Sequence, residues 1–418
     1  MLDTLDSLEV RAPEARERDL MARLPQLIAQ AMQAPGWARI LAGVDPASIT
    51  SRAALAALPV TRKSDLKALQ QGALPFGGLN STPLAQLRRL YMSPGPIFDP
   101  EGQSADWWRF ARPMYAAGVR AGGLLQNCFS YHFTPAAFMV EAGAARIGCA
   151  VIPAGSGQTE MQVQAMANLK PDTYIGTPSF LKIIIEKARD MKIDISSVQR
   201  ALMGGEALPE SLRSWFIENG VPHVFQTYAS ADLGSIAFET ATDGVRDPGM
   251  VLDEELILEI VRPGSGDPVA PGEVGEVVVT LFNPDYPLIR FATGDLSATL
   301  LDPQASGSGR TNARIKGWMG RADQTTKVRA MFVHPSQVHQ IAQRHPEILK
   351  ARLVVSGQMA NDIMTLQCEV DHAPQASTIA AIQESIRELT KLRGEVLFVA
   401  PGSLPGDGKV IADLRDYK

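Results

Sequence analysis

Three charged residues that end short sequence segments are candidates for binding or catalysis. Asp295 ends the segment PLIRFATGD, Asp232 ends YASAD and Lys409 ends GDGK. A carboxylate has two acceptor oxygens and can take two hydroxyl donors at once. A plain structural alternative exists for each segment: a Gly-Asp turn at a strand end, a helix N-cap at Ser230 and a solvated lysine in a flexible tail.

Composition places the chain among ordinary globular proteins and excludes several classes. The 418 residues are 45% hydrophobic and 20% charged, with a net charge of −5, so there is no electrostatic reason to expect nucleic-acid binding. Three scattered cysteines form no CxxC pair and support neither a zinc site nor a disulfide framework. The charged N-terminus is unlike a secretory signal, and no uncharged apolar run could span a membrane. We expect a reduced, cytoplasmic location.

The first three hundred residues predict an α/β domain. Leu20, Leu24, Leu27 and Ile28 have helical spacing, so a helix is expected from Ala15 to Met32, and another from Ala105 to Ala117. Short apolar runs then alternate with helical stretches, which indicates βαβ units and a mainly parallel sheet. The predicted strands are Leu124–Phe129, Cys149–Pro153, Thr173–Ile175, Arg200–Met203 and His223–Gln226. The predicted helices between them are Pro135–Ile147, Glu160–Leu169, Pro178–Met191 and Pro209–Asn219.

The character of the chain then changes. Glu255–Val261 and Gly275–Leu281 alternate between apolar and polar residues and are flanked by Gly and Pro, which indicates antiparallel strands. From about Asp323 a small α+β domain is expected. Its predicted helices are Pro335–Arg344 and Ala376–Leu392, and its predicted strands are Ala351–Ser356, Ile363–Val370 and Glu395–Val399. The predicted domains are therefore 1–322 and 323–418.

Several segments resemble phenylacetate–CoA ligases, in the same order and at the same spacing. Gly148–Val163 (GCAVIPAGSGQTEMQV) is similar to that family's GCTVIP…GGQTE…QV, and Lys170–Phe180 (KPDTYIGTPSF) to its KPD…TPSY. Further on, YASAD takes the place of YGLSE, PLIRFATGD that of PxIRYRTGD, and Arg314–Pro335 that of RI.GR.DD…RG.NVFP. The match runs from about Tyr115 to the C-terminus. It implies an AMP-binding domain followed by a C-terminal lid domain.

The resemblance also implies roles for individual residues. Asp295 would bind both ribose hydroxyls, Tyr228 would stack on adenine and Asp232 would hold Mg²⁺ against the phosphates. Lys409 would stabilise charge at the α-phosphate and carboxylate when the lid closes about the hinge Asp323. The other implied nucleotide contacts are Gly204, Gly205, Glu206, Ala229, Ser230, Arg321, Ser93 and Gly95. For the acyl group it implies Tyr131, Phe133, Thr134 and Phe138, whose aromatic rings suit a planar acid; core packing is the alternative for these four.

The sequence departs from the family pattern where the triphosphate is expected to bind. The family's loop SSGTTGKPT is replaced by YMSPGPIF (Tyr91–Phe98), which keeps Ser93 and Gly95 but loses the Thr-Thr-Gly core and the lysine. Such loops hold phosphates through successive N–H groups and hydroxyls, and Pro94 and Pro96 have no N–H to donate. Ala231 also replaces a hydroxyl residue.

Three functions remain open at this point. The first is an ATP-dependent ligase that activates an aromatic carboxylic acid and transfers the acyl group to CoA, with ATP/AMP, Mg²⁺ and coenzyme A as cofactors. The second is a degenerate homologue that binds an adenylate without turnover. The third is an adenylating enzyme with an acceptor other than CoA. The resemblance implies a homodimer. Charge and hydropathy give no reason to expect nucleic-acid or membrane partners.

Overall fold

The chain forms two compact units, Met1–Gly320 and Arg321–Lys418. The computed structural model describes residues 3–93, 96–301, 307–322, 324–329, 331–357, 361–371, 376–405 and 409–415. The predicted domain boundary at 322/323 lies two residues beyond the boundary between the units. In the described part of the chain, no helix has the length and apolar character that a membrane crossing requires.

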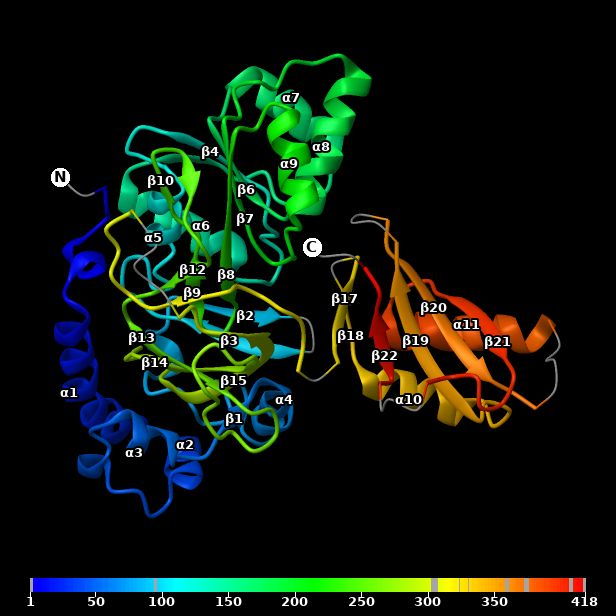
Figure 1. The fold of residues 1–418 in the computed structure, drawn as a ribbon, viewed down its shortest axis with the longest axis horizontal. Helices are drawn as coiled ribbons and strands as arrows, with labels where there is room; N and C mark the ends of the chain where they lie inside the picture. Colours follow the sequence, from blue (N-terminus) through cyan, green and yellow to red (C-terminus); the bar gives the residue numbers. More distant parts are fainter. Residues whose placement is uncertain are drawn as a thin grey trace. The chain divides into compact units, whose positions relative to one another are not determined.

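An eight-stranded sheet, largely parallel, organises the first unit (Figure 1). Its order is β16-β12-β9-β8-β7-β6-β4-β5, and neighbouring strands from β8 to β5 are parallel. The parallel strands are β4 (Leu124–Asn127), β5 (Ala150–Ile152), β6 (Thr173–Gly176), β7 (Arg200–Met203) and β8 (His223–Ser230). The antiparallel strands are β9 (Gly234–Phe238), β12 (Met250–Leu252) and β16 (Arg314–Ile315).

The parallel strands are connected by helices, as the sequence pattern predicts. The helices are α6 (Ala136–Ile147), α7 (Thr159–Leu169), α8 (Pro178–Met191) and α9 (Glu210–Glu218). Since β5 and β6 lie on opposite sides of β4, the chain reverses its winding direction there. Ligands of open α/β sheets bind at such a switch point, beyond the carboxyl ends of the strands. The predicted α/β class is confirmed.

A second sheet and two short hairpins complete the strand framework of this unit. The sheet order is β1-β15-β14-β13. Its strands are β1 (Thr61–Arg62), β13 (Leu256–Val261), β14 (Gly275–Leu281) and β15 (Leu288–Ser297). The predicted antiparallel pairing of β13 with β14 is confirmed. The hairpins are formed by β2 (Arg89–Ser93) with β3 (Ile97–Glu101) and by β10 (Ala241–Thr242) with β11 (Val245–Arg246).

The N-terminal helices lie beside the second sheet (Figure 1). They are α1 (Pro13–Ala31), α2 (Pro35–Ile40), α3 (Arg52–Ala56) and α4 (Lys63–Gly72). A further helix, α5 (Ala111–Ala116), contacts α6 and β9 of the main sheet instead. There are 3₁₀ turns at Ser7–Val10, Pro46–Ser48 and Leu84–Gln86. The apolar face predicted for α1 is buried. Arg23 of α1 pairs with Glu255, and the Trp37 indole of α2 donates to the carbonyl of Pro287 at 3.0 Å.

The helix predicted over Ala105–Ala117 is wrong for its first half. Asp106 and Arg109 have φ values of 49° and 60°, which a right-handed helix does not permit. The Asp106 carboxylate accepts hydrogen bonds from the N–H groups of Phe110 (2.7 Å) and Ala111 (3.1 Å). It satisfies donors at the start of α5, and the helix therefore begins at Ala111.

The second unit has the small α+β fold that its sequence predicts. Its main sheet has the order β21-β20-β19-β22, and a hairpin β17-β18 precedes it. The strands are β17 (Thr326–Val328), β18 (Met331–Val333), β19 (Lys350–Ser356), β20 (Ile363–Glu369), β21 (Glu395–Val399) and β22 (Ile411–Asp413), and the helices are α10 (Pro335–Arg344) and α11 (Ala376–Thr390). It has an apolar core of its own, with Ile382, Ile386 and Leu366 at its centre.

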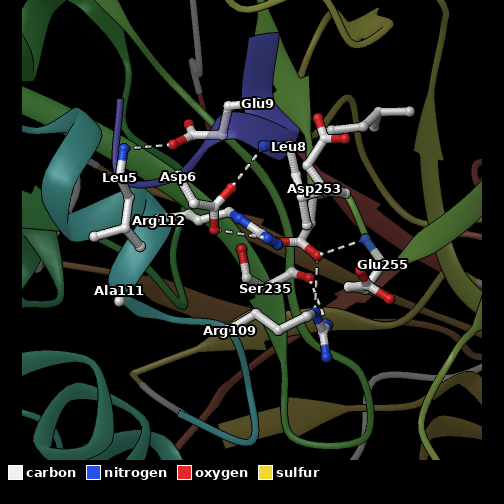
Figure 2. Close-up of polar contacts among 12 residues, drawn as sticks. Leu5, Asp6, Leu8, Glu9, Arg109, Ala111, Arg112, Ser235, Asp253 and Glu255 are labelled. Carbon is white, nitrogen blue, oxygen red and sulfur yellow. Dashed lines mark hydrogen bonds and ion pairs between the residues drawn. The ribbon is translucent and has the colours of Figure 1, made fainter. Parts of the chain in front are cut away.

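A buried ionic network ties the N-terminal segment to the main sheet (Figure 2). Asp253, whose side chain is 0% exposed, accepts from Arg109 Nε at 2.8 Å and pairs with Arg112 Nη1 at 3.3 Å. Arg112 Nη2 also pairs with Asp6 at 3.0 Å. Arg109 Nη2 donates to the carbonyls of Leu233 (2.6 Å) and Ser235 (2.9 Å). The network therefore fixes the turn between β8 and β9.

We predict that Asp253→Ala strongly destabilises the first unit, because it leaves two buried guanidinium groups without their shared carboxylate. Breaking a buried pair typically costs about 3–5 kcal/mol. Asp19 is a matched control, since it also pairs with two arginines, Arg11 and Arg23, but its side chain is 41% exposed. Asp19→Ala should cost at most about 1 kcal/mol. Urea unfolding measures both, and equal losses would contradict a structural role for the network.

Candidate functional site

Most of the predicted site residues of the first unit lie at one edge of the main sheet. Gly204–Glu206 follow β7, and Tyr228–Ser230 end β8. Tyr131, Phe133 and Thr134 lie between β4 and α6, and Phe138 is in the first turn of α6. Because these strands are parallel, their carboxyl ends meet at the same edge. The fold brings together three segments that are separated by up to a hundred residues.

Asp295 is joined to the end of β8 by a direct hydrogen bond. The Tyr228 hydroxyl donates to Asp295 Oδ2 at 2.8 Å, and the Trp318 indole donates to Oδ1 at 3.0 Å. Tyr228 itself is 9% exposed. The TGD carboxylate is thus held in one orientation by two aromatic side chains.

The glycine loop after β7 is shaped by close packing. A side chain at Gly204 would meet Thr227 Cγ2 at 3.3 Å and the Phe129 ring at 3.5 Å. Gly205 has a φ of 75°, which favours glycine. Glu206 accepts from the N–H of Ser179 at 3.3 Å, in the first turn of α8. The loop therefore presents peptide surface, and the Glu206 carboxylate serves to hold it in place.

The turn that carries Asp232 is a hairpin turn. Residues 231–233 join β8 to β9, so the helix N-cap considered for Ser230 is wrong. Ser230 Oγ instead accepts from the N–H of Leu233 at 3.2 Å, and Ala229 pairs with Ser235 across the hairpin. Gly234 has a φ of 69°, and a Cβ there would lie 2.7 Å from the carbonyl oxygen of Trp108. Only glycine fits this approach.

Asp232 is buried against a lysine and a second aspartate that sequence reasoning missed. Its Oδ2 forms an ion pair with Lys63, the first residue of α4, and the residue is only 2% exposed. Asp99 of β3 lies beside it. Burial, followed by the charge of Asp232, raises the pKa of Asp99 to about 8. No motif marks Lys63 or Asp99, since both reach Asp232 only through the tertiary fold.

Ser93 survives from the expected phosphate loop, but its hydroxyl is directed at protein. It ends β2, pairs with Ile97 across a hairpin, and donates to Asp99 Oδ2 at 2.6 Å. Gly95 lies outside the described residues.

The four residues predicted to contact the acyl group include both packed and exposed side chains. Tyr131 and Phe138 meet edge to face, with centroids 5.4 Å apart. The Tyr131 hydroxyl donates to Glu141 at 2.6 Å and accepts from Asn127 at 2.9 Å. Thr134 donates to the carbonyl of Ser130 at 3.2 Å. Phe133 is 58% exposed, and its carbonyl accepts from the N–H of Met92 in β2.

Comparisons with known proteins agree with this arrangement. A family model described as AMP-binding enzyme matches residues 118–281. The phenylacetate-coenzyme A ligase of Thermus thermophilus is 28% identical over 383 residues, which cover 88% of this chain and 83% of that protein. The enzyme of the same name from Escherichia coli is 26% identical, with 90% and 89% covered. Along most of its length the chain is therefore similar to phenylacetate-coenzyme A ligases, and its central part matches the AMP-binding enzyme model.

Solved structures show the same fold. A 2-hydroxyisobutyryl-CoA ligase, crystallised with 2-HIB-AMP and CoA, superposes with a TM-score of 0.84 at 24% identity, covering 98% of this chain and 92% of that one. An amide bond synthetase from Marinactinospora thermotolerans has a TM-score of 0.57 at 16% identity, with 95% and 93% covered. At these identities the likeness establishes the fold of this ligase-like chain.

The arginine within the segment PLIRFATGD has a structural role. Arg290 is 2% exposed and pairs with Glu259 at 3.0 Å. It also donates to the carbonyls of Ala56, Leu58 and Gly266. It therefore joins the second sheet to the N-terminal helices and is committed within the core.

The remaining predicted residues belong to the second unit. Lys409 is exposed and precedes β22, where the N–H of Val410 donates to Gln324 Oε1 at 2.8 Å. Arg321 is half-buried at the start of this unit. The predicted hinge, Asp323, lies outside the described residues.

The two buried carboxyl groups of Asp99 and Asp232, called the acidic pair below, have the chemistry of ligands for a single divalent cation. In the described part of the chain, no group of three or more His, Cys, Asp or Glu side chains could hold a metal. Among those residues, Asp99 Oδ1 and Asp232 Oδ1 are buried without a hydrogen-bond partner. Oxygen donors of this kind suit Mg²⁺, which commonly uses one or two carboxylates together with substrate phosphates.

The raised pKa of Asp99 predicts how stability depends on pH. The folded chain keeps a proton that the unfolded chain releases above the ordinary value of 3.8. The free energy of unfolding should therefore fall as pH rises toward about 8. Asp99→Asn removes this ionisation, so its stability gain over the parent should grow between about pH 5 and pH 8 in metal-free buffer. Asp65→Asn, at an exposed position of α4, is the control. A gain that does not change with pH would contradict the assignment.

Proposed function

We propose that the chain is an ATP-dependent acyl-CoA ligase for an aromatic, phenylacetate-like or benzoate-like carboxylic acid. It would form an acyl-adenylate with release of pyrophosphate and then transfer the acyl group to the thiol of CoA. The observation that carries the proposal is the Asp295 carboxylate, oriented by Tyr228 and Trp318 beside the carboxyl ends of the parallel strands. The relatives named above support the CoA-ligase assignment.

The nucleoside would be held mainly by rigid groups. Asp295 would accept the two ribose hydroxyls, because its oxygens are already fixed in direction. Gly204 and Gly205 would let the backbone approach the adenine closely. The Tyr228 ring would pack on the base while its hydroxyl holds Asp295. Ala229 and Ser230 complete this side.

The acid would bind against the aromatic pair that follows β4. The edge-to-face contact of Tyr131 with Phe138 provides an apolar wall, and Glu141 fixes the Tyr131 hydroxyl. Stacking of this kind adds about 0.5–1.5 kcal/mol to the burial of a planar ring. Thr134 lies beside this wall, and Phe133 is available to a ligand because it is exposed.

Several groups would compensate the negative charge of the phosphates. Asp232 would hold Mg²⁺, which supplies positive charge to the phosphate oxygens when bound. Lys409 of the second unit would stabilise the charge that develops at the α-phosphate and the acid. Arg321 would lie near the ribose and phosphate. Asp323 would be the hinge about which the second unit closes as a lid. The proposal includes the cytoplasmic location expected from the sequence and the homodimer that the resemblance implies.

A second candidate is an adenylate-binding protein with little turnover. One observation favours it: Ser93 and Asp232, expected at the triphosphate, are both bonded to protein groups. The third candidate is an adenylating enzyme that uses an acceptor other than CoA, and the nucleoside site described here would serve it equally well.

Pyrophosphate exchange over a panel of aryl acids separates the three candidates. A ligase should exchange labelled pyrophosphate into ATP with at least one acid and then form its CoA ester. Exchange without CoA-ester formation would indicate another acceptor, and adenylate binding without exchange would indicate the second candidate. Asp295→Ala should abolish exchange by removing the ribose acceptor, whereas Asp267→Ala, at an exposed loop position, should not. Full exchange by Asp295→Ala would place the nucleoside elsewhere.

Lys409→Ala should separate chemistry from binding. Loss of one preorganised charge donor commonly lowers kcat by about 10²–10³. We therefore expect adenylate formation to fall by that order while AMP affinity, measured by calorimetry, changes little. Arg393→Ala removes an exposed cation of the same unit and is the control. Equal losses of rate and affinity in Lys409→Ala would contradict the proposed role.

A further inference from the structure

We propose that Asp99 is a second carboxylate ligand for the divalent cation, so that this chain binds the cation between the β2–β3 hairpin and the β8–β9 turn. This inference rests on the proposed function in one respect, the assignment of Asp232 as a cation ligand. Asp99 is outside every motif that the sequence shares with phenylacetate–CoA ligases, and the mechanism given above does not use it.

The first support is a pair of unsatisfied atoms. Asp99 is 1% exposed and Asp232 is 2% exposed. Among the described residues, neither Oδ1 atom has a hydrogen-bond partner, while the two carboxyl groups lie next to each other. Burial of a carboxylate without compensation is costly, and two adjacent carboxylates repel. A proton or a cation is needed between them.

The second support is the contrast with Glu101, two residues further along the same strand. Glu101 is equally buried, but Arg89 Nη1 donates to both its oxygens at 3.0 and 2.9 Å, and the Tyr91 hydroxyl donates at 2.6 Å. The protein itself therefore supplies hydrogen-bond donors to both oxygens of the buried Glu101 carboxylate. Asp99 accepts a hydrogen bond from the Ser93 hydroxyl, and within the described ranges its Oδ1 has no donor.

The third support is the charge and chemistry of the surroundings. Lys63 occupies Asp232 Oδ2, so two carboxylates face one ammonium group. The phenol of Tyr286 is also buried near both acids, and its hydroxyl has no partner among the described residues. Two carboxylate oxygens and nearby hydroxyls are hard oxygen ligands, which Mg²⁺ and Mn²⁺ accept. Once Asp99 has lost its proton, the two carboxylates carry one negative charge more than Lys63 compensates, and a divalent cation would neutralise it.

The hairpin geometry explains why position 99 can reach the turn. Gln70 of α4 exchanges two hydrogen bonds with the backbone of Phe98, at 2.8 and 2.9 Å. Lys63 begins the same helix. Helix α4 thus contacts both segments, pairing with Asp232 through Lys63 at its start and with Phe98, the neighbour of Asp99, through Gln70 near its end.

Mn²⁺ binding to the full chain, followed by electron paramagnetic resonance without nucleotide, tests the inference. The parent should bind one ion, and Asp99→Asn and Asp232→Asn should each weaken binding roughly tenfold or more, the order seen when metal-site groups are lost. Asp65→Asn should bind like the parent. Circular dichroism checks that each variant is folded, and Asp99→Ser is a second probe if Asn perturbs the hairpin.

The outcomes separate this inference from the proposed function. Unchanged or tighter Mn²⁺ binding by folded Asp99→Asn, or no binding by the parent at millimolar ion, would overturn the ligand role and leave a shared proton as the function of Asp99. Pyrophosphate exchange could still occur in that case. Conversely, Mn²⁺ binding that depends on Asp99 in a chain without exchange would support the inference and overturn the ligase proposal.

Discussion

Burial of the Asp232 carboxylate is the constraint on which the rest of the site depends. A charged group that is almost inaccessible to water must be compensated by the protein. The compensation comes from Lys63, which lies 169 positions earlier in the chain. To deliver it, α4 must pack on the β2–β3 hairpin, and the β8–β9 turn must hold its shape. Gly234 permits that shape, and Arg109 fixes it through the carbonyls of Leu233 and Ser235.

The N-terminal region thereby becomes part of the site. Arg109 is oriented by Asp253, which also binds Arg112, and Arg112 in turn binds Asp6. Arg290 joins the α3 region to the second sheet that carries Asp295. These are buried ionic contacts, whose free energy depends strongly on exact pairing. A change far from Asp232 or Asp295 can therefore shift these carboxylates.

Local sequence pattern predicted the elements better than it predicted the site. Alternating apolar residues and flanking Gly and Pro located β13, β14 and most of the second unit, because side-chain periodicity is a local property. The pattern failed at Ala105–Phe110, where the Asp106 carboxylate satisfies N–H groups that a longer helix would have used. Tyr228 and Asp295 were identified from motifs, but their mutual hydrogen bond was not. Lys63, Asp99 and Trp318 were missed altogether, since each acts through a partner distant in sequence.

The shortened hairpin has a consequence beyond the loss of phosphate donors. Pro94 and Pro96 have no N–H group, so this segment of the sequence offers fewer backbone donors than a phosphate loop. Ser93 gives its proton to Asp99, so the one hydroxyl retained from the expected loop supports a carboxylate. The expected loop would offer hydrogen-bond donors to an anion, whereas here Ser93 donates to an acidic side chain. An anion is disfavoured beside the two acids, Asp99 and Asp232, whereas a cation is favoured. If a triphosphate binds here, its negative charge must reach this hairpin through a cation, and the acidic pair is the feature that would make the shorter loop compatible with ATP.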